Sequence, residues 1–221
     1  MNAPRRLDGW TVSLAGLMAL AVYPSNGLGA QTVGLGIQGV LASYREQTSA
    51  LQFAGKGFAA TAWLARGRLG ADVVFSNIDY EPEGPVGRFK ARQIDARVRY
   101  LVASGVSAEV GFTKRTADPD FDAQSVGAVR VGLRAAYLLG PGADITARAN
   151  YLAGAKFSGG GQSPFGVEMG LGISVGKSNG RFRFIGDYEF QRFNRTTDNG
   201  SGEVKVPIQQ TVARIGLGVG F

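Results

Sequence analysis

The sequence has 221 residues, 34 of them glycine, and a formal net charge of +7. This length suits a single domain with a sizeable core. The chain contains no cysteine, which excludes disulfides, and no histidine, which removes the usual general base near neutral pH. The basic residues are not gathered in one run, so the positive charge does not predict binding to nucleic acid.

Residues 1–30 have the layout of a secretory signal peptide. Arg5 and Arg6 form a positive segment, and a short apolar run follows from Trp10 to Val22. Small residues then lead to Ala30, after which we expect cleavage. The apolar run is short for a membrane-spanning helix, and an uncleaved N-terminal anchor is the alternative. The predicted mature domain therefore comprises residues 31–221.

From Gln31 to the end of the chain, apolar residues recur at every second position. In "SVGAVRVGLRAAYLL", for example, Val129 and Val131 lie on the face opposite Arg130. A period of two indicates strands with one apolar face and one face of small or polar residues. The predicted strands span about 32–43, 54–65, 68–79, 88–102, 105–116, 125–139, 143–157, 165–177, 181–195 and 206–221.

The segments between these strands alternate in length. Tight turns such as "RGR", "ASG", "GPG" and "SNG" alternate with longer polar connections such as "IDYEPEGPVG" and "TTDNGSGEVK". This alternation predicts an all-β fold, an antiparallel up-and-down barrel of about ten strands with two unequal rims. Merging two weak strands within 51–80 would give about eight strands instead.

The two faces of the strands differ in side-chain volume. Glycine, alanine, serine and charged residues fill one face, and long apolar side chains fill the other. Aromatic residues lie near the ends of the apolar faces: Tyr100, Phe112, Tyr137, Tyr151, Phe182, Tyr188 and Phe190. This distribution predicts a transmembrane barrel with an outward apolar face and a narrow polar lumen. A soluble barrel that binds an apolar ligand inside is the alternative.

The C-terminal segment "ARIGLGVGF" carries the most specific pattern. Arg214, Gly216, Val219 and Phe221 place a polar residue, a glycine, a hydrophobic residue and a final aromatic in order. With this ending, the chain resembles bacterial outer-membrane β-barrel proteins of the small opacity-type or porin-like group. The resemblance covers residues 31–221 and implies an outer-membrane location, surrounded by lipid and lipopolysaccharide. It also implies that the barrel-assembly machinery reads the C-terminal segment during biogenesis.

The predicted inner face collects arginines and carboxylates in nearly equal numbers. They are Asp72, Asp95, Arg97, Arg99, Glu109, Arg130, Arg134, Arg148, Glu168, Arg183, Asp187, Glu189 and Arg214. We expect ion pairs that fill the lumen, because a small barrel leaves little room beyond its side chains. This predicts a structural or surface-interaction role through the longer connections. A narrow channel for ions or small solutes is the alternative.

Other candidate chemistry is weak. Barrel enzymes of the outer membrane rely on a histidine, and the remaining candidate pair, Asp187 and Glu189, is expected to bind Arg183 instead. We therefore predict no enzymatic activity. The loop residues Asp118, Asp120 and Asp122 lack the glycine and glutamate of a calcium loop. The segment "GKGFAA" lacks the order of a phosphate loop, so we predict neither a metal nor a cofactor.

Overall fold

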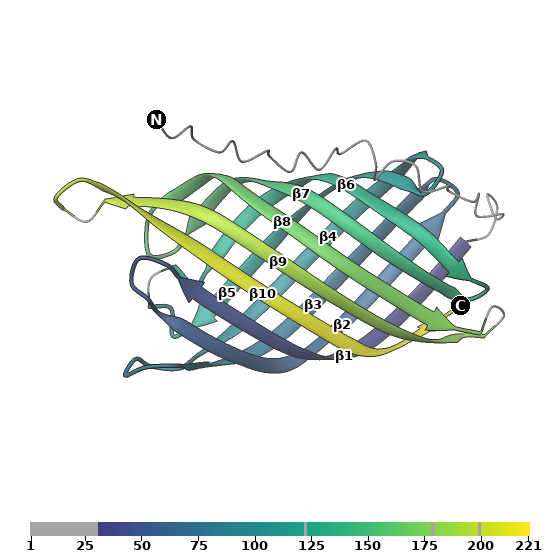
Figure 1. Cartoon of the computed structure of the whole chain (residues 1–221), viewed down its shortest axis with the longest axis horizontal. Helices are drawn as coiled ribbons and strands as arrows, with labels where there is room; N and C mark the ends of the chain where they lie inside the picture. Colours follow the sequence, from purple (N-terminus) through teal and green to yellow (C-terminus); the bar gives the residue numbers. More distant parts are fainter. Residues whose placement is uncertain (1–30, 122, 178–179, 199) are drawn as a thin grey trace, which may run out of the picture.

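The computed structural model describes residues 31–121, 123–177, 180–198 and 200–221 (Figure 1). The predicted signal peptide, residues 1–30, lies outside the described residues. No helix in the described ranges is long and apolar enough to cross a membrane. The strands are β1 (Gln31–Glu46), β2 (Gln52–Arg66), β3 (Leu69–Pro82), β4 (Phe89–Ala103), β5 (Val106–Asp118), β6 (Val126–Gly140), β7 (Ala143–Phe157), β8 (Gln162–Gly176), β9 (Phe182–Asp198) and β10 (Glu203–Gly220).

These strands form one closed antiparallel barrel in which each strand pairs with its neighbours in sequence. The count is therefore ten, and the eight-strand alternative is wrong. The barrel closes where β1 pairs with β10, from Gly34 opposite Gly220 to Glu46 opposite Ile208. Phe221 extends this pairing, because its amide donates to the Val33 carbonyl at 2.7 Å. Closure leaves no strand edge unpaired, as a lipid environment requires.

The two ends of the barrel differ. At the turn end, the chain reverses at Gly67, Gly105 and Gly142, which adopt positive φ angles that suit tight turns. The C-terminus also lies at this end, on the right of Figure 1. The opposite end, called the loop end here, carries the connections 47–51, 83–88, 119–125, 158–161 and 199–202. These connections are shorter than the sequence predicted, because the strand pairing continues into the polar segments.

The outer face of the barrel carries an apolar belt. On β8, Met169, Leu171 and Ile173 are 58%, 62% and 41% exposed, and similar side chains cover the other strands. Toward the loop end the outward residues become polar, as at Lys114 on β5. Since a tilted spanning strand needs about 9–11 residues, strands of 13 to 18 residues cross a bilayer with some overhang. The fold is a transmembrane β-barrel, as the periodicity predicted.

Aromatic side chains border the apolar belt. The outward aromatics predicted from the sequence are exposed or half-buried, among them Tyr100 at 47%, Phe112 at 48% and Phe182 at 71%. Phe221 is 68% exposed at the turn end. Tyr151 packs against Phe165 on the neighbouring strand, with their ring centroids 5.5 Å apart. Such rings suit the two membrane–water interfaces.

The inner face alternates with this belt, residue by residue. On β1, Gly34, Gly36, Gln38 and Val40 are buried, whereas the residues between them are exposed. The turn-end part of the lumen also holds Trp63 of β2. Its indole occupies the space that a Cβ would need at Gly34 and at Gly218. The two glycines therefore let β1 and β10 pass beside a large ring inside a narrow barrel.

Candidate functional site in the barrel lumen

Strand β4 shows how the lumen is layered along the barrel. From the turn end, its inward residues are Arg99, Arg97, Asp95, Gln93, Ala91 and Phe89. Arg99 lines a cavity, Arg97 and Asp95 belong to a buried charged layer, and Phe89 belongs to an aromatic layer. The lumen thus contains a vestibule, a charged layer and an aromatic layer in that order.

All of the predicted lumen residues point inward in the structure, and ion pairs connect them. Arg130 is fully buried between Asp95 on β4 and Glu168 on β8, at 2.5 and 2.9 Å. Arg214 binds Asp187 at 3.1 Å and is 1% exposed. Each arginine reaches carboxylates on other strands, so the pairs tie the walls of the barrel together. The planar guanidinium suits this role because it donates in several directions and keeps its charge.

Glu189 lies at the centre of the charged layer. Its Oε2 atom accepts hydrogen bonds from Arg97 at 2.8 Å and from Arg148 at 2.6 Å. Gln191 donates to its other oxygen at 2.7 Å. Asp187 binds Arg214 rather than Arg183, which instead binds Asp144 at 2.8 Å. The expected contact between this carboxylate pair and Arg183 is therefore wrong, because Arg183 lies nearer the turn end.

Sequence reasoning missed several polar members of the charged layer. Asn150 donates to Glu109 and Glu168 at 2.8 and 3.0 Å. Gln93 donates to Asp95 at 2.9 Å, and Gln210 donates to Gln93 at 3.1 Å. These amides share the alternation of the charged residues, so their inward direction was readable from the sequence. The partners on strands that are not neighbours, Glu109 for Asn150 and Gln93 for Gln210, were not readable, because they depend on how the barrel closes.

A vestibule of about 400 Å³ lies between the charged layer and the turn end. Arg99 binds Asp72 there at 3.0 Å. Arg134 also faces this cavity, but its nearest carboxylate oxygen, on Asp72, is 3.7 Å away. Arg134 also lies directly opposite Arg148 in the pairing of β6 with β7. Among the lumen arginines predicted from the sequence, Arg134 is therefore the least compensated.

An aromatic layer fills the lumen toward the loop end, and the sequence analysis missed it. Tyr44, Phe53, Tyr80 and Phe89 are at most 2% exposed. The rings of Tyr80 and Phe89 stack at 4.7 Å, and Phe53 meets Phe89 edge-on at 5.0 Å. These aromatic residues occupy the same alternate strand positions as the glycines and charged residues, so the period of two would have placed them inside. The available signal was a large side chain on a strand face that otherwise carries small side chains.

The aromatic layer is linked to polar groups on both sides. Gln210 donates a hydrogen bond to the Tyr80 hydroxyl at 3.1 Å, which connects this layer to the charged layer. The Tyr44 hydroxyl donates to Glu46 at 2.8 Å. Both residues lie in the loop-end part of β1, where the outward residues are polar.

The acidic loop after β5 does not gather its carboxylates. Asp120 accepts hydrogen bonds from the Ser125 amide and the Ser158 hydroxyl, whereas Asp118 is exposed at the end of β5. Asp122 lies outside the described residues. Within the described part of the chain, no group of acidic residues could hold a metal ion. Asp120 instead fastens the connection between β5 and β6 to the end of β7.

The residues of the C-terminal pattern take two directions. Arg214 points into the charged layer, and Gly216 passes so close to β1 that an added Cβ would collide with the Ile37 carbonyl. Val219 and Phe221 lie on the outer face. The glycine therefore has a packing reason in the finished barrel, whereas exposed Phe221 contributes little to packing.

Comparison with solved structures places the fold among bacterial outer-membrane β-barrels. The outer-membrane protease OmpT from Escherichia coli aligns with a TM-score of 0.50 and 8% identity, over 92% of this chain and 99% of that chain. The transport unit of the autotransporter AIDA-I from Escherichia coli aligns with a TM-score of 0.44 and 12% identity, over 92% and 94%. Neisserial surface protein A gives a TM-score of 0.40 and 15% identity, over 86% and 96%.

At these identities the likeness to OmpT concerns the fold alone, and a shared barrel does not carry a protease activity with it. No protein-family model matches the sequence, and no curated protein matches it. The function is therefore argued from the geometry of this chain.

Proposed function

We propose that this chain is an integral outer-membrane barrel with a closed lumen and a structural or surface-interaction role at its loop end. The outward apolar belt supports a membrane location, because its large exposed side chains suit lipid rather than water. The tight turns at one end and longer connections at the other match the periplasmic and extracellular ends of such barrels. On this proposal, lipid and lipopolysaccharide surround the belt.

The stacking of two filled layers across the lumen is the observation that carries the proposal. Arg130 and Glu168 are fully buried in the charged layer, and Phe89 is 2% exposed in the aromatic layer. A solute would have to break ion pairs in the first layer and then displace packed rings in the second. Such a lumen acts as a core that stiffens the wall.

The loop end supports the surface role. Strands β9 and β10 project beyond the other strands on the left of Figure 1, and their pairing continues to Asp198 opposite Glu203. Polar pairs cover this rim, including Lys56 with Glu81 at 3.3 Å and Lys90 with Asp79 at 3.5 Å. Paired strands hold this surface in a fixed shape, which suits contact with an extracellular partner.

Planar-bilayer recording tests whether the lumen is closed. We expect no unitary current steps from the protein, because both layers exclude a continuous water path. Heat-modifiable migration of the same preparation provides the control that the inserted protein is folded. Steps that change in size in Arg130→Ala or Arg134→Ala would support the narrow-channel alternative, which the open vestibule of about 400 Å³ favours.

Fractionation tests the membrane location. We expect the protein in the membrane fraction and its release only by detergent. Recovery in the soluble periplasmic fraction would support the alternative of a secreted barrel with an apolar ligand. The outward direction of the apolar side chains and the charged lumen count against that alternative.

We further propose that residues 1–30 are removed on export and that the C-terminal segment addresses the chain to the barrel-assembly machinery. Phe221 is 68% exposed, so its deletion should leave the stability of the folded barrel nearly unchanged while it lowers the yield of assembled protein. Pulse-labelling of outer-membrane fractions measures the yield, and urea unfolding of the purified barrel measures the stability. Normal assembly of the truncated chain would contradict the signal.

A further inference from the structure

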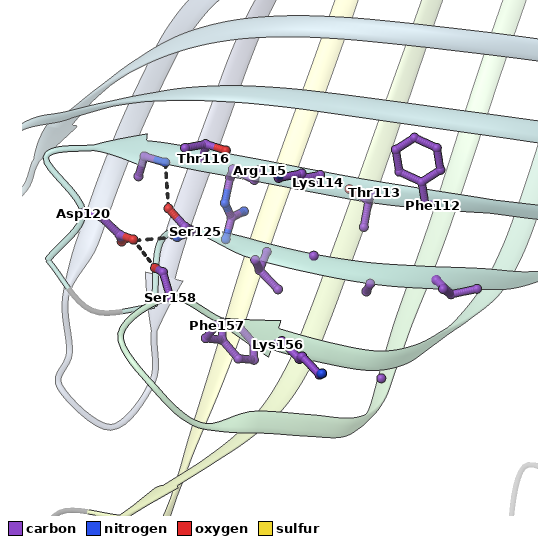
Figure 2. A pocket seen from close by; sticks show the side chains of 16 residues that line it. Phe112, Thr113, Lys114, Arg115, Thr116, Asp120, Ser125, Lys156, Phe157 and Ser158 are labelled. Atoms are coloured by element: carbon purple, nitrogen blue, oxygen red, sulfur yellow. Dashed lines mark hydrogen bonds between the residues drawn. The ribbon is translucent and has the colours of Figure 1, made fainter.

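A groove crosses the outer wall over strands β5, β6 and β7, near the loop end (Figure 2). Its volume is about 740 Å³. Gly127 of β6 and Gly154 of β7 form part of its floor, where an added Cβ at Gly127 would meet only one atom, 4.0 Å away, and one at Gly154 would meet none within 4 Å. The groove therefore exists because two outward positions carry no side chain.

Two lysines lie on opposite sides of this floor. In the strand pairing, Lys114 of β5 lies opposite Gly127, and Gly127 lies opposite Lys156 of β7. Since neighbouring strands are about 4.8 Å apart, the two lysine Cα atoms are about 10 Å apart, and two flexible four-carbon stems can close around one anion. Both lysines are exposed, and no ion pair joins either to a carboxylate in the described part of the chain.

A second row of the same kind on the outer wall provides an internal comparison. Lys56 of β2 lies opposite Asp79 of β3, which lies opposite Lys90 of β4. There Lys90 binds Asp79 at 3.5 Å, and Lys56 binds Glu81 at 3.3 Å. The row on β5–β7 has glycine where the row on β2–β4 has aspartate. Lys114 and Lys156 consequently have no carboxylate between them, where Asp79 binds Lys90 in the other row.

The groove lies across the border of the apolar belt. In the next outward row toward the turn end, Phe112 lies opposite Val129, and these side chains are 48% and 51% exposed. Toward the loop end, Asp120 and Ser158 form a polar rim and bind each other, as the dashed lines in Figure 2 show. An occupant thus meets apolar side chains on one side and two cations beside a polar rim on the other.

We propose that this groove binds a lipid with a phosphate monoester in its headgroup, from the membrane leaflet at the loop end. The phosphate would lie between Lys114 and Lys156 over Gly127, because a dianionic monoester matches two ammonium groups. The acyl chains would lie along the apolar side chains on the turn-end side of the phosphate. Continuity with the belt favours a lipid over free phosphate. This inference rests on the proposed membrane location.

Native mass spectrometry of the detergent-solubilised full chain tests the proposal, with phosphatidic acid, phosphatidylcholine of the same acyl chains and inorganic phosphate as probes. We expect binding of phosphatidic acid in preference to both others. Each basic residue near an anionic headgroup contributes a similar amount to the binding free energy. The double variant Lys114→Ala, Lys156→Ala loses two such contributions and should weaken that binding about thirtyfold. Gly127→Asp should weaken it as well, because it supplies the missing carboxylate in open space.

The double variant Lys56→Ala, Lys90→Ala is the matched control, since it removes the same charge from the row with its own carboxylates. Its affinity for phosphatidic acid should equal that of the unaltered protein. An equal loss in both double variants, no loss in the first, or equally strong binding of inorganic phosphate would each overturn the proposal. Fractionation separates the lipid site from the membrane location. If the protein is recovered with membranes but binds phosphatidic acid and phosphatidylcholine equally, the lipid site is refuted and the membrane location is not.

Discussion

The charged layer and the aromatic layer fill the same barrel by different means. In the charged layer, Arg130 and Arg214 bind carboxylates from several strands, and each partner depends on the others. In the aromatic layer, Phe89 packs ring against ring with Tyr44, Phe53 and Tyr80. Removal of one ion leaves a buried charge unpaired, whereas removal of one ring leaves a cavity. The two layers should therefore respond differently to single substitutions.

The largest expected effect is in the charged layer. Arg130→Ala leaves Asp95 and Glu168 without their closest cation and should lower the free energy of unfolding by about 3–5 kcal/mol. Urea unfolding in lipid vesicles, followed by the fluorescence of Trp63 in the lumen, measures this change. Arg134→Ala is the control. The Arg134 side chain is 25% exposed and has one carboxylate contact at 3.7 Å, so it should contribute less than about 1 kcal/mol to the free energy of unfolding. Equal losses would mean that burial does not distinguish these arginines.

The aromatic layer should show a slightly smaller effect. Phe89→Ala removes the ring that contacts Tyr44, Phe53 and Tyr80 and should cost about 3–4 kcal/mol. The contacts of Phe89 with the neighbouring rings involve no ion pair. The loss in Phe89→Ala should therefore be the same at low and high ionic strength. A loss that fell steeply with added salt would contradict a packing origin.

A third substitution compares the lumen with the lipid face at one point of the chain. Arg130 is inside and fully buried, whereas the next residue, Val131, is outside and 52% exposed. Val131→Arg places a guanidinium in the apolar belt and should cost about 2–4 kcal/mol in vesicles. The variant Val131→Leu should change the stability by less than about 1 kcal/mol. An unchanged stability of Val131→Arg would mean that the two faces are inverted.

The alternation of side chains was readable from the sequence because a strand turns successive residues to opposite faces. It assigned Arg130 inward and Val131 outward, and it located all ten strands within a few residues. The glycine-rich turns separated the two ends. The extent of the loop-end connections was not readable, since polar segments such as those around Glu81 continue the strand pairing.

What remained hidden was the level of each residue along the barrel. Asp187 and Arg183 share a face of β9, yet they bind partners at different heights, Arg214 and Asp144. That height depends on the register and tilt of every strand, which neighbouring residues do not encode. The same stagger brings Phe53 and Phe89 together and sets Gly127 between Lys114 and Lys156.

By itself, the sequence determined the approximate positions of the strands and which residues share a face, because these follow from a period of two, and residue size favoured an apolar face turned outward. The closed barrel fixed the count at ten and turned the apolar face outward. Only the tertiary structure decided that the lumen is filled in two layers and that one lysine row lacks its carboxylate. Those features arise from contacts between strands far apart in the chain, and the closure of the barrel fixes which residues meet.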